Sequence, residues 1–344
     1  MNASSTHDTK RAEDVRARIS VLSEMPQEWQ KHLHLWAAMN EKFKIAGNGG
    51  AMVPDHNEEY FLYQTLLGMW PLEPSELGGV LERLQSYGVK AIREAMVHTR
   101  WTRPNLTHEE GLKKFIAAIL DEKLNNAFLE DFLSFHRHIA FYGMLNGLSQ
   151  TLLKITAPGV PDFYQGSELW DLRLVDPDNR GTVDFARRIE LLQSFNQDVT
   201  QETAGFVREL LKNWTDGRIK LYLIAKALRF RQEFSKLFTD GKFVPAEISG
   251  ERSQNVTAFF RIFQNQRVLI LAPKWLAGSG MEQNSNEHAR FWGDTSVVLP
   301  DMVTSWRNIL TSDSIAAQRN RDAGLSVSEA LKDFPVALLL SDPS

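Results

Sequence analysis

The sequence contains no cysteine, and this absence excludes a disulfide framework, a thiolate nucleophile and a zinc–thiolate site. It also lacks any apolar run near the roughly 20 residues that a membrane-spanning helix requires, so we expect no role in a membrane. The sequence also lacks an excess of positive charge, because its 39 basic residues are interspersed with 43 acidic ones. We therefore expect no nucleic-acid partner. Residues 1–10 lack the apolar core of a secretory signal, and we therefore expect a cytoplasmic protein.

Motifs for common cofactors are missing as well. The sequence has no GxGxxG, no Walker loop and no HExxH. The loop that begins at Asp176 invites comparison with a calcium loop, because Gly181 falls at its sixth position. The twelfth position is Arg187, where a bidentate Glu is required, and Arg180 occupies a ligand position. This loop is therefore not expected to bind calcium.

The histidine spacing also argues against a metal site. His32 and His34 lie two residues apart on a predicted helix, and so do His136 and His138. Side chains two apart point to different faces of a helix, so neither pair is expected to share an ion. We expect neither a metal nor a cofactor.

A long helical region occupies the first part of the chain. At 344 residues the chain exceeds the ~250–300 at which a single core stops growing, so two or three structural units are expected. Breakers at Gly47, Gly49, Gly50 and Pro54 predict a loop, and no strand pattern interrupts residues 11–153. Apolar residues at helical spacing predict a helix from Glu58 and helices over residues 11–25, 27–48, 74–85, 90–96, 107–120 and 126–153.

The pattern changes after Leu152. Apolar residues beside Pro-Gly and Pro-Asp breakers predict a short buried strand within 152–164, followed by a loop to about Asp184. Helices are predicted over 185–195 and 218–234. Alternation of apolar and polar residues then predicts a hairpin over 256–272 that turns near Gln264, with strands at 296–300 and 336–340. The tail is therefore expected to be a small β-sandwich.

Aromatic residues are plentiful, with nine Trp and twenty Phe. Their flat apolar faces stack on sugar rings, but they are equally good material for a hydrophobic core. The core interpretation is the more usual one for any single aromatic residue.

Two polar segments beside breakers are candidates for function. The first, Thr6 to Arg11, precedes a helix, so Asp8 or Thr9 has the alternative role of an N-cap. The second, Pro158 to Trp170, places carboxylate, amide, Tyr and Trp side chains after the predicted strand, and a turn-rich connection is its alternative interpretation. Residue physics alone leaves both alternatives open.

Both segments resemble conserved regions of the α-amylase clan. Thr6-His7-Asp8 resembles the His-Asp at the end of barrel strand seven, and residues 159–168 resemble the strand-eight pattern G-x-P-x-x-Y-x-G-x-E. Their context, in order and spacing, is similar to the maltooligosyltrehalose synthases over most of residues 1–240. The matching stretches are HDTKR with EDVRAR, EEY with YQTLLG, VHT with WT, ELWDL with VDPDNR, and GRIKL. A departure follows Arg180, where Gly181-Thr182-Val183 stand in place of the family's Arg-Pro-Val.

The resemblance implies the C-terminal portion of such an enzyme. The implied fold is an α/β barrel fragment carrying the last strand or strands of a TIM-type barrel, with a large all-α insertion and a C-terminal β-sandwich. The implied boundaries are 1–12 for the end of strand seven, 13–151 for the insertion, 152–242 for strand eight with the following helices, and 243–344 for the β-rich domain.

The resemblance also implies roles for individual residues. Asp8 would be the catalytic carboxylate that stabilises the transition state. The substrate-binding residues would be His7, Lys10, Arg11, Tyr164, Gln165, Glu168, Trp170, Asp176, Asp178, Asn179 and Arg180. The family's nucleophile and general acid would lie in a missing N-terminal half, and the two carboxyl groups that retaining glycoside chemistry needs would come from there.

The implied reaction is an intramolecular glucosyl transfer that converts the reducing-end α-1,4 linkage of a maltooligosaccharide into an α,α-1,1 linkage. Because barrel active sites draw residues from several strands, we expect the chain to be inactive alone. Two alternatives remain open: a non-catalytic maltooligosaccharide-binding or assembly module, and another α-amylase-clan hydrolase.

Overall fold

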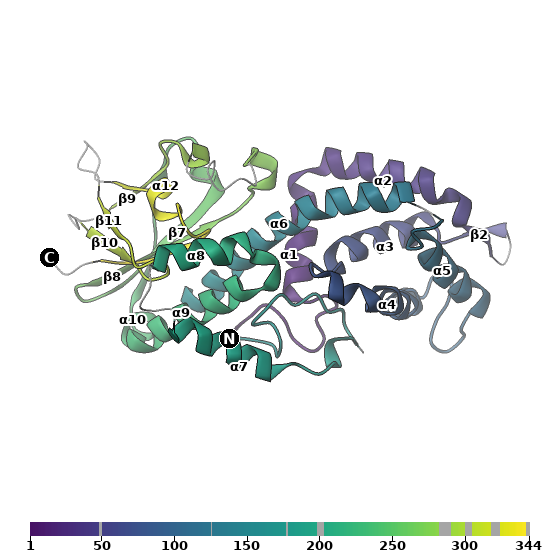
Figure 1. The fold of residues 1–344 in the computed structure, drawn as a ribbon, viewed down its shortest axis with the longest axis horizontal. Coiled ribbons are helices and arrows are strands. Elements are labelled where there is room, and N and C mark those ends of the chain that lie inside the picture. The colour runs from purple at the N-terminus through teal and green to yellow at the C-terminus, as the bar shows by residue number, and fades with distance from the viewer. Residues whose placement is uncertain are drawn as a thin grey trace. The chain divides into compact units, whose positions relative to one another are not determined.

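The computed structural model describes residues 1–47, 50–124, 126–176, 178–197, 203–281, 290–299, 305–317 and 324–341. The chain divides into two compact units. The helical unit comprises His7–Gly143 and Leu172–Gly181, and the sheet unit comprises Met1–Thr6, Met144–Asp171 and Thr182–Ser344. The long helix α6 (Asn126–Thr156) contributes to both units, and Figure 1 labels most of the helices and several of the strands.

In its described residues, the helical unit contains five α-helices besides its share of α6. They are α1 (Glu13–Val21), α2 (Pro26–Asn40), α3 (His56–Met69), α4 (Val80–Ala95) and α5 (Leu106–Ile119). The prediction of an uninterrupted all-α region was wrong in one place. Strands β2 (Ile45–Ala46) and β3 (Met52–Val53) pair antiparallel around the predicted breaker loop, in which Gly49 lies outside the described residues.

The predicted helices at 74–85 and 90–96 were divided at the wrong place. The chain instead forms a 3-10 segment over Pro74–Gly79 and one continuous helix, α4, that runs through Gly88. Gly88 is buried, and a Cβ there would lie 3.4 Å from Leu112 and 3.5 Å from Ile116. The glycine therefore marks close packing of α4 on α5 and does not mark a break.

Aromatic residues form much of the core of the helical unit. Trp36 is fully buried, and its indole N–H donates to Asp131 Oδ2 at 2.6 Å. Its ring contacts rings from α2, α3 and α6, namely Trp29, His32, Tyr63, Phe128, Phe132 and Phe135. The core interpretation is thus confirmed for Trp36 and for the buried Trp29, Trp292 and Trp306, whereas Trp101 is 56% exposed and Trp275 54% exposed.

A buried cation lies where α1 meets α6. Arg18 donates from Nη1 to the carbonyl oxygens of Gly68 and Trp70, at 3.1 and 2.6 Å. Burial lowers the pKa of Arg18 to about 10, so its guanidinium remains charged at neutral pH. Gly143 lets α6 approach this position, because a Cβ on Gly143 would lie 2.9 Å from the Cα of Arg18.

The sheet unit begins with two short parallel strands. β1 (Asn2–Ala3) pairs with β4 (Pro161–Asp162), so residues 159 positions apart in the sequence lie side by side. The strand predicted within 152–164 was mostly wrong, because α6 continues to Thr156. Leu152 and Ile155 are fully buried at helical spacing, and Thr156 Oγ1 donates to the Leu152 carbonyl at 2.7 Å, so this apolar stretch ends the helix.

Two antiparallel sheets follow, which confirms the predicted β-rich tail. One has the order β11-β10-β13-β8-β7-β5, and the other has the order β12-β9-β6. The predicted hairpin is confirmed as β7 with β8, joined by a turn in which Gln264 has φ 53°. The strands are β5 (Lys242–Pro245), β6 (Ile248–Ser249), β7 (Val256–Phe263), β8 (Gln266–Pro273), β9 (Ser296–Val298), β10 (Ser305–Asn308), β11 (Ser314–Ala316), β12 (Gly324–Ser326) and β13 (Ala337–Ser341).

Helices complete the sheet unit. They are α7 (Phe185–Gln197), α8 (Thr203–Lys212), α9 (Arg218–Glu233), α10 (Ser235–Thr239) and α12 (Val327–Ala330), of which α8, α10 and α12 were not predicted. Across the described residues, none of the helices has both the length and the apolarity needed to cross a membrane. Within this part of the chain no sheet closes on itself, and parallel pairing occurs between β1 and β4.

Candidate functional site

The His7–Asp8 pair lies at the surface of the helical unit. His7 Nε2 lies 3.3 Å from Asp8 Oδ2, and the two side chains are 78% and 86% exposed. Helix α1 begins at Glu13 with Ala12 as its N-cap and has no side-chain cap. The N-cap alternative for Asp8 and Thr9 is therefore wrong.

The loop over residues 172–180 holds this segment in place. The two run antiparallel, with a bridge between Arg11 and Leu174 and a hydrogen bond from Val175 N to the Lys10 carbonyl at 3.0 Å. The Asn179 side chain donates from Nδ2 to the His7 carbonyl at 2.9 Å, and its Oδ1 accepts from Asp176 N. Asn179 is buried, so it fixes the backbone of His7 from below the surface.

The carboxylates of this loop are paired with cations. Asp178 accepts from Arg83 Nε and Nη2 at 2.9 Å each, and its Oδ2 also accepts from Leu174 N at 2.8 Å. Asp176 pairs with Arg180 at 2.8 Å and with Lys90 at 3.5 Å. Arg83 and Lys90 thus provide the positive charge that these two carboxylates face.

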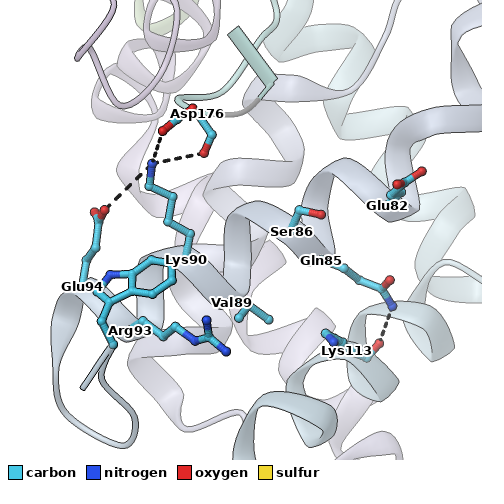
Figure 2. Close-up of a pocket in the computed structure, with 10 residues that line it drawn as sticks. Glu82, Gln85, Ser86, Val89, Lys90, Arg93, Glu94, Lys113 and Asp176 are labelled. Atoms are coloured by element: carbon cyan, nitrogen blue, oxygen red, sulfur yellow. Dashed lines mark hydrogen bonds and ion pairs between the residues drawn. The ribbon is translucent and has the colours of Figure 1, made fainter. Parts of the chain in front are cut away.

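A pocket of about 710 Å³ opens beside this loop. Figure 2 shows Lys90 between Glu94 and Asp176 at one end of it. The pocket is lined by Glu82, Gln85, Ser86, Val89, Lys90, Arg93, Glu94, Trp101, Lys113 and Asp176. Two predicted site residues reach it: Asp176 lines it, and Lys10 donates to Glu94 Oε2 at 2.9 Å. The hydrogen bond to Glu94 raises the pKa of Lys10, so the ammonium is charged at neutral pH.

Trp101 gives the pocket its flat wall. The guanidinium of Arg93 lies 4.8 Å from the centre of the Trp101 ring. Glu109 fixes this guanidinium by accepting from its Nε and Nη2 at 2.8 and 2.6 Å, and Thr99 Oγ1 donates to Glu109 at 2.6 Å. An exposed ring beside carboxylate, amide and ammonium groups suits a ligand that has both apolar faces and many hydroxyl groups.

The sheet unit carries the second predicted segment, which follows β4. Its backbone turns sharply over residues 165–168, where Gly166 has φ 90°, so the turn-rich alternative describes the backbone correctly. Glu168 nevertheless forms an ion pair with Arg188 Nε at 2.9 Å, and the Trp170 indole N–H donates to the Trp214 carbonyl at 2.6 Å. These two contacts hold the side chains of Glu168 and Trp170 in a defined orientation.

The predicted site residues fall into two groups. One group lies in the helical unit: His7, Asp8, Lys10, Arg11, Asp176, Asp178, Asn179 and Arg180. The other lies in the sheet unit: Tyr164, Gln165, Glu168 and Trp170. Within the first group, Arg11 donates from Nη2 to Thr65 Oγ1 at 2.8 Å and so ties the segment to α3.

Sequence reasoning missed the contribution of α4. Arg83 and Lys90 were not singled out, although they neutralise the two loop carboxylates. They precede their partners by 95 and 86 residues, and only the fold brings them together. The available signal was two cations seven residues apart on one helix, which is two helical turns.

Comparisons with known proteins agree with the resemblance seen in the sequence. No protein-family model matches the chain. A protein of Mycobacterium tuberculosis with the provisional name maltooligosyl trehalose synthase is 32% identical over 342 residues. The match covers 99% of this chain and 38% of that protein, so the chain spans well under half the length of the curated relatives it matches.

Solved structures give the same result. The maltooligosyltrehalose synthase of Arthrobacter ramosus is 32% identical with a TM-score of 0.74, over 98% of this chain and 38% of that one. A Sulfolobus tokodaii protein described as a hypothetical maltooligosyl trehalose synthase is 28% identical with a TM-score of 0.70, over 99% of this chain and 38% of that one. The chain is therefore similar in fold and in sequence to a part of these proteins.

Proposed function

We propose that this chain, which is homologous along nearly its whole length to part of the maltooligosyl trehalose synthases, contributes the sugar-binding side of the active site of such an enzyme. The observation that carries the proposal is the exposed His7–Asp8 pair, whose backbone is fixed by the loop over 172–180. A surface carboxylate on a fixed backbone is suited to grip sugar hydroxyl groups.

The proposed reaction is an intramolecular glucosyl transfer on a maltooligosaccharide. A carboxylate attacks the anomeric carbon of the last α-1,4 linkage, while a carboxylic acid protonates the leaving oxygen of the reducing-end glucose. The freed glucose turns within the site, and its anomeric hydroxyl attacks the glycosyl-enzyme as the second carboxyl group takes up the proton. Two displacements at one carbon preserve its α configuration and give an α,α-1,1 linkage.

The residues of this chain have supporting roles in the proposal. Asp8 binds hydroxyl groups of the distorted sugar, and His7 donates to the same ring. The nucleophile and the acid come from a segment of the enzyme outside these 344 residues, in agreement with the 38% coverage of the relatives. We further propose that Asp178 and Asn179 act by positioning the His7 segment, because Arg83 and the loop backbone already bind their side chains.

Water must be kept from the glycosyl-enzyme if transfer is to exceed hydrolysis. We assign this role to the helical insertion and to the turn that carries Tyr164, Gln165, Glu168 and Trp170. The parallel β1–β4 pair supports β1 and β4 as the final two barrel strands, with 13–151 as the insertion between them and 243–344 as the C-terminal β-rich domain.

The role of Asp8 is tested by Asp8→Asn in a reassembled enzyme, in which this chain is joined to the part of the Arthrobacter ramosus enzyme that it does not match. We expect the rate of trehalose-ended product formation from maltopentaose to fall about 100-fold or more, because a charge that stabilises the transition state is lost. Asp240→Asn, at an exposed carboxylate of the sheet unit, is the control. An unchanged rate in Asp8→Asn would remove Asp8 from the mechanism.

A second candidate function is binding of maltooligosaccharide without turnover. The pocket beside Trp101 favours it, because this pocket lies wholly within the helical unit and needs no residue from elsewhere. Affinity for maltopentaose without any product from the reassembled enzyme would favour this candidate. Release of free glucose alone would favour an α-amylase-clan hydrolase.

A further inference from the structure

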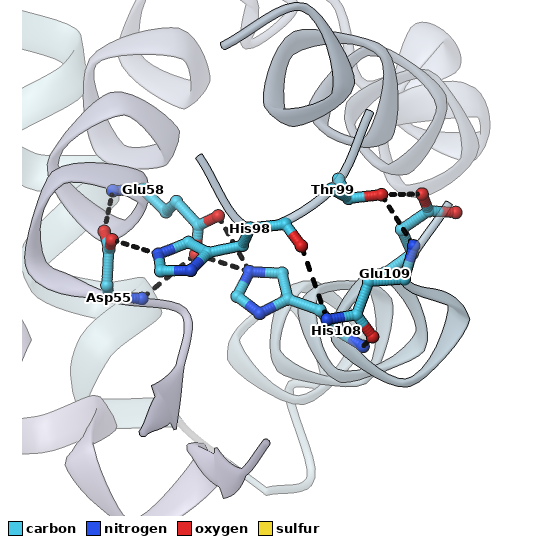
Figure 3. Close-up of polar contacts among 7 residues, drawn as sticks. Asp55, Glu58, His98, Thr99, His108 and Glu109 are labelled. Atoms are coloured by element: carbon cyan, nitrogen blue, oxygen red, sulfur yellow. Dashed lines mark hydrogen bonds and ion pairs between the residues drawn. The ribbon is translucent and has the colours of Figure 1, made fainter. Parts of the chain in front are cut away.

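Two histidines and two carboxylates meet in the helical unit where the N-termini of α3 and α5 approach each other. Asp55 is the N-cap of α3, and Glu58 is the third residue of that helix. His108 is the third residue of α5, and His98 lies in the connection between α4 and α5. Figure 3 shows the two imidazole rings side by side, facing the two carboxylates.

The distances within this cluster are short. His98 Nε2 lies 2.7 Å from Asp55 Oδ2, and His108 Nε2 lies 2.8 Å from Glu58 Oε1. The two rings stack with their centres 4.5 Å apart and their planes inclined by 24°. Ligand atoms of Glu58, His98 and His108 all lie within 4.8 Å of one another, and no other such group of three occurs in the part of the chain that the structure describes.

We propose that Glu58, His98 and His108 bind a divalent transition-metal ion of the zinc class, with Asp55 as a fourth ligand or as the partner that orients His98. Imidazole nitrogen and carboxylate oxygen are ligands that zinc prefers. Ligand atoms around a tetrahedral zinc ion lie roughly 3.3 Å apart, given metal–ligand bonds of about 2.0–2.1 Å. A small rotation of the side chains therefore suffices to close the site.

Two carboxylate ligands are held in place before any ion binds. Asp55 Oδ1 accepts from the Glu58 backbone N–H at 2.8 Å, and Glu58 Oε2 accepts from the Asp55 backbone N–H at 3.0 Å. This capping box orients both carboxylates toward the imidazoles. Partners of this kind, which orient the ligands, are a regular feature of metal sites.

The position of the cluster also suits a cation. The Asp55 and Glu58 carboxylates lie at the N-terminus of α3 and face the imidazoles of His98 and His108. The carboxylate oxygens and imidazole nitrogens are all electron-pair donors, so together they offer ligands that a divalent transition-metal ion takes.

Burial shields the site without closing it. The side chains of His108 and Glu58 are 7% and 11% exposed, whereas those of His98 and Asp55 are 30% and 34% exposed. An ion can therefore enter on the His98 side. Bound there, it would fix the connection that continues through Thr99 to Trp101 and would stiffen that wall of the pocket.

The alternative explanation is a pair of hydrogen-bonded His–carboxylate contacts without any metal. The same unit provides a matched example, because His32 Nδ1 lies 2.7 Å from Asp131 Oδ2 and no third ligand completes that pair among the described residues. His32→Gln is therefore the control for His98→Gln and Glu58→Gln. In Glu58→Gln the amide oxygen can still accept from Asp55 N, so the helix cap is preserved.

The test is a calorimetric titration of the 344-residue chain with ZnCl₂, together with visible absorption after addition of Co²⁺. We expect one Zn²⁺ per chain, a Co²⁺ spectrum typical of tetrahedral nitrogen and oxygen ligands, and affinity at least tenfold weaker in His98→Gln and Glu58→Gln than in His32→Gln. Thermal melting with and without Zn²⁺ provides a second readout, since an ion that binds only the folded state raises the melting temperature.

Two results would overturn the proposal: no saturable Zn²⁺ or Co²⁺ binding by the folded chain, or equal affinity in all three variants. If Glu58→Gln fails to fold, the Zn²⁺ affinity of His98→Gln tests the proposal by itself. His98 lies outside any helix, so its replacement leaves the helix caps in place. These readouts measure metal binding alone, so they are independent of the proposed glucosyl transfer.

Discussion

At the scale of single residues, the approach of α1 and α6 rests on the missing side chain of Gly143. A Cβ there would lie 2.5 Å from Arg18 Cγ and 2.9 Å from Arg18 Cα, and the second atom belongs to a helix backbone. Arg18 cannot move away without losing its bonds to the Gly68 and Trp70 carbonyl groups. The buried guanidinium would then lose its two carbonyl acceptors.

We therefore predict that Gly143→Ala lowers the free energy of unfolding by about 1–3 kcal/mol, as overpacking of a core does. Gly88→Ala is the matched control, because Gly88 is also a buried helical glycine but its Cβ would meet only flexible side-chain atoms at 3.4 Å or beyond. There the gain in helix propensity, up to about 1 kcal/mol, should leave stability unchanged or raised. Urea unfolding of the two variants measures the difference, and an equal loss in both would contradict this account.

At the same scale, the sequence predicted which segments carry the site but not what their side chains contact. His7, Asp8 and Asp176 could be named because they stand in recognisable motifs. The cations that pair with Asp178 and Asp176 could not be named, because Arg83 and Lys90 lie 86 or more residues away in the sequence. The proposed metal cluster was missed for the same reason. Local spacing in the sequence singles out histidines two residues apart, whereas Glu58, His98 and His108 are separated by 40 and 10 residues.

At the scale of elements, hydrophobic periodicity worked best where one local rule decides the structure. The β7–β8 hairpin was predicted because alternation and a polar turn coincide, and the register pairs Phe263 with Gln266 across that turn. Prediction failed where tertiary packing overrode a local signal. Separate helices were predicted over 74–85 and 90–96 where α4 is continuous, and the apolar residues up to Ile155 suggested a strand although they end α6.

The pocket wall formed by α4 and the following connection leads to a prediction about sugar binding. Trp101→Ala should weaken the affinity of the chain for maltopentaose about tenfold, because the exposed ring offers the flat apolar face on which a sugar ring stacks. Trp275→Ala is the matched control. Trp275 is exposed to nearly the same extent, and a lysine ammonium lies 4.2 Å from its ring, but it lines no part of this pocket.

Isothermal titration calorimetry with maltopentaose measures the affinity of both variants. Equal affinity in Trp101→Ala and Trp275→Ala would show that the pocket is not a glucan site. The predicted roles of His7 and Asp8 would be untouched by that outcome, because the two residues do not line this pocket.

At the scale of the whole molecule, the match to the curated relatives covers 99% of this chain but only 38% of the length of each relative. A barrel enzyme builds its active site from the ends of several strands, and this chain offers one short parallel pair in its described residues. Its side chains can bind and orient a sugar, but in our account they do not supply both the nucleophile and the acid. Activity is thus predicted to require a further part of the enzyme.

The most direct measurement compares three samples with maltopentaose as substrate: the chain alone, the unmatched part of the Arthrobacter ramosus enzyme alone, and the two co-purified as a complex. Chromatography separates the trehalose-ended product from free glucose. We predict that the trehalose-ended product forms only with the complex. Formation of that product by the chain alone would contradict the account, because it would mean that these 344 residues contain their own nucleophile and acid.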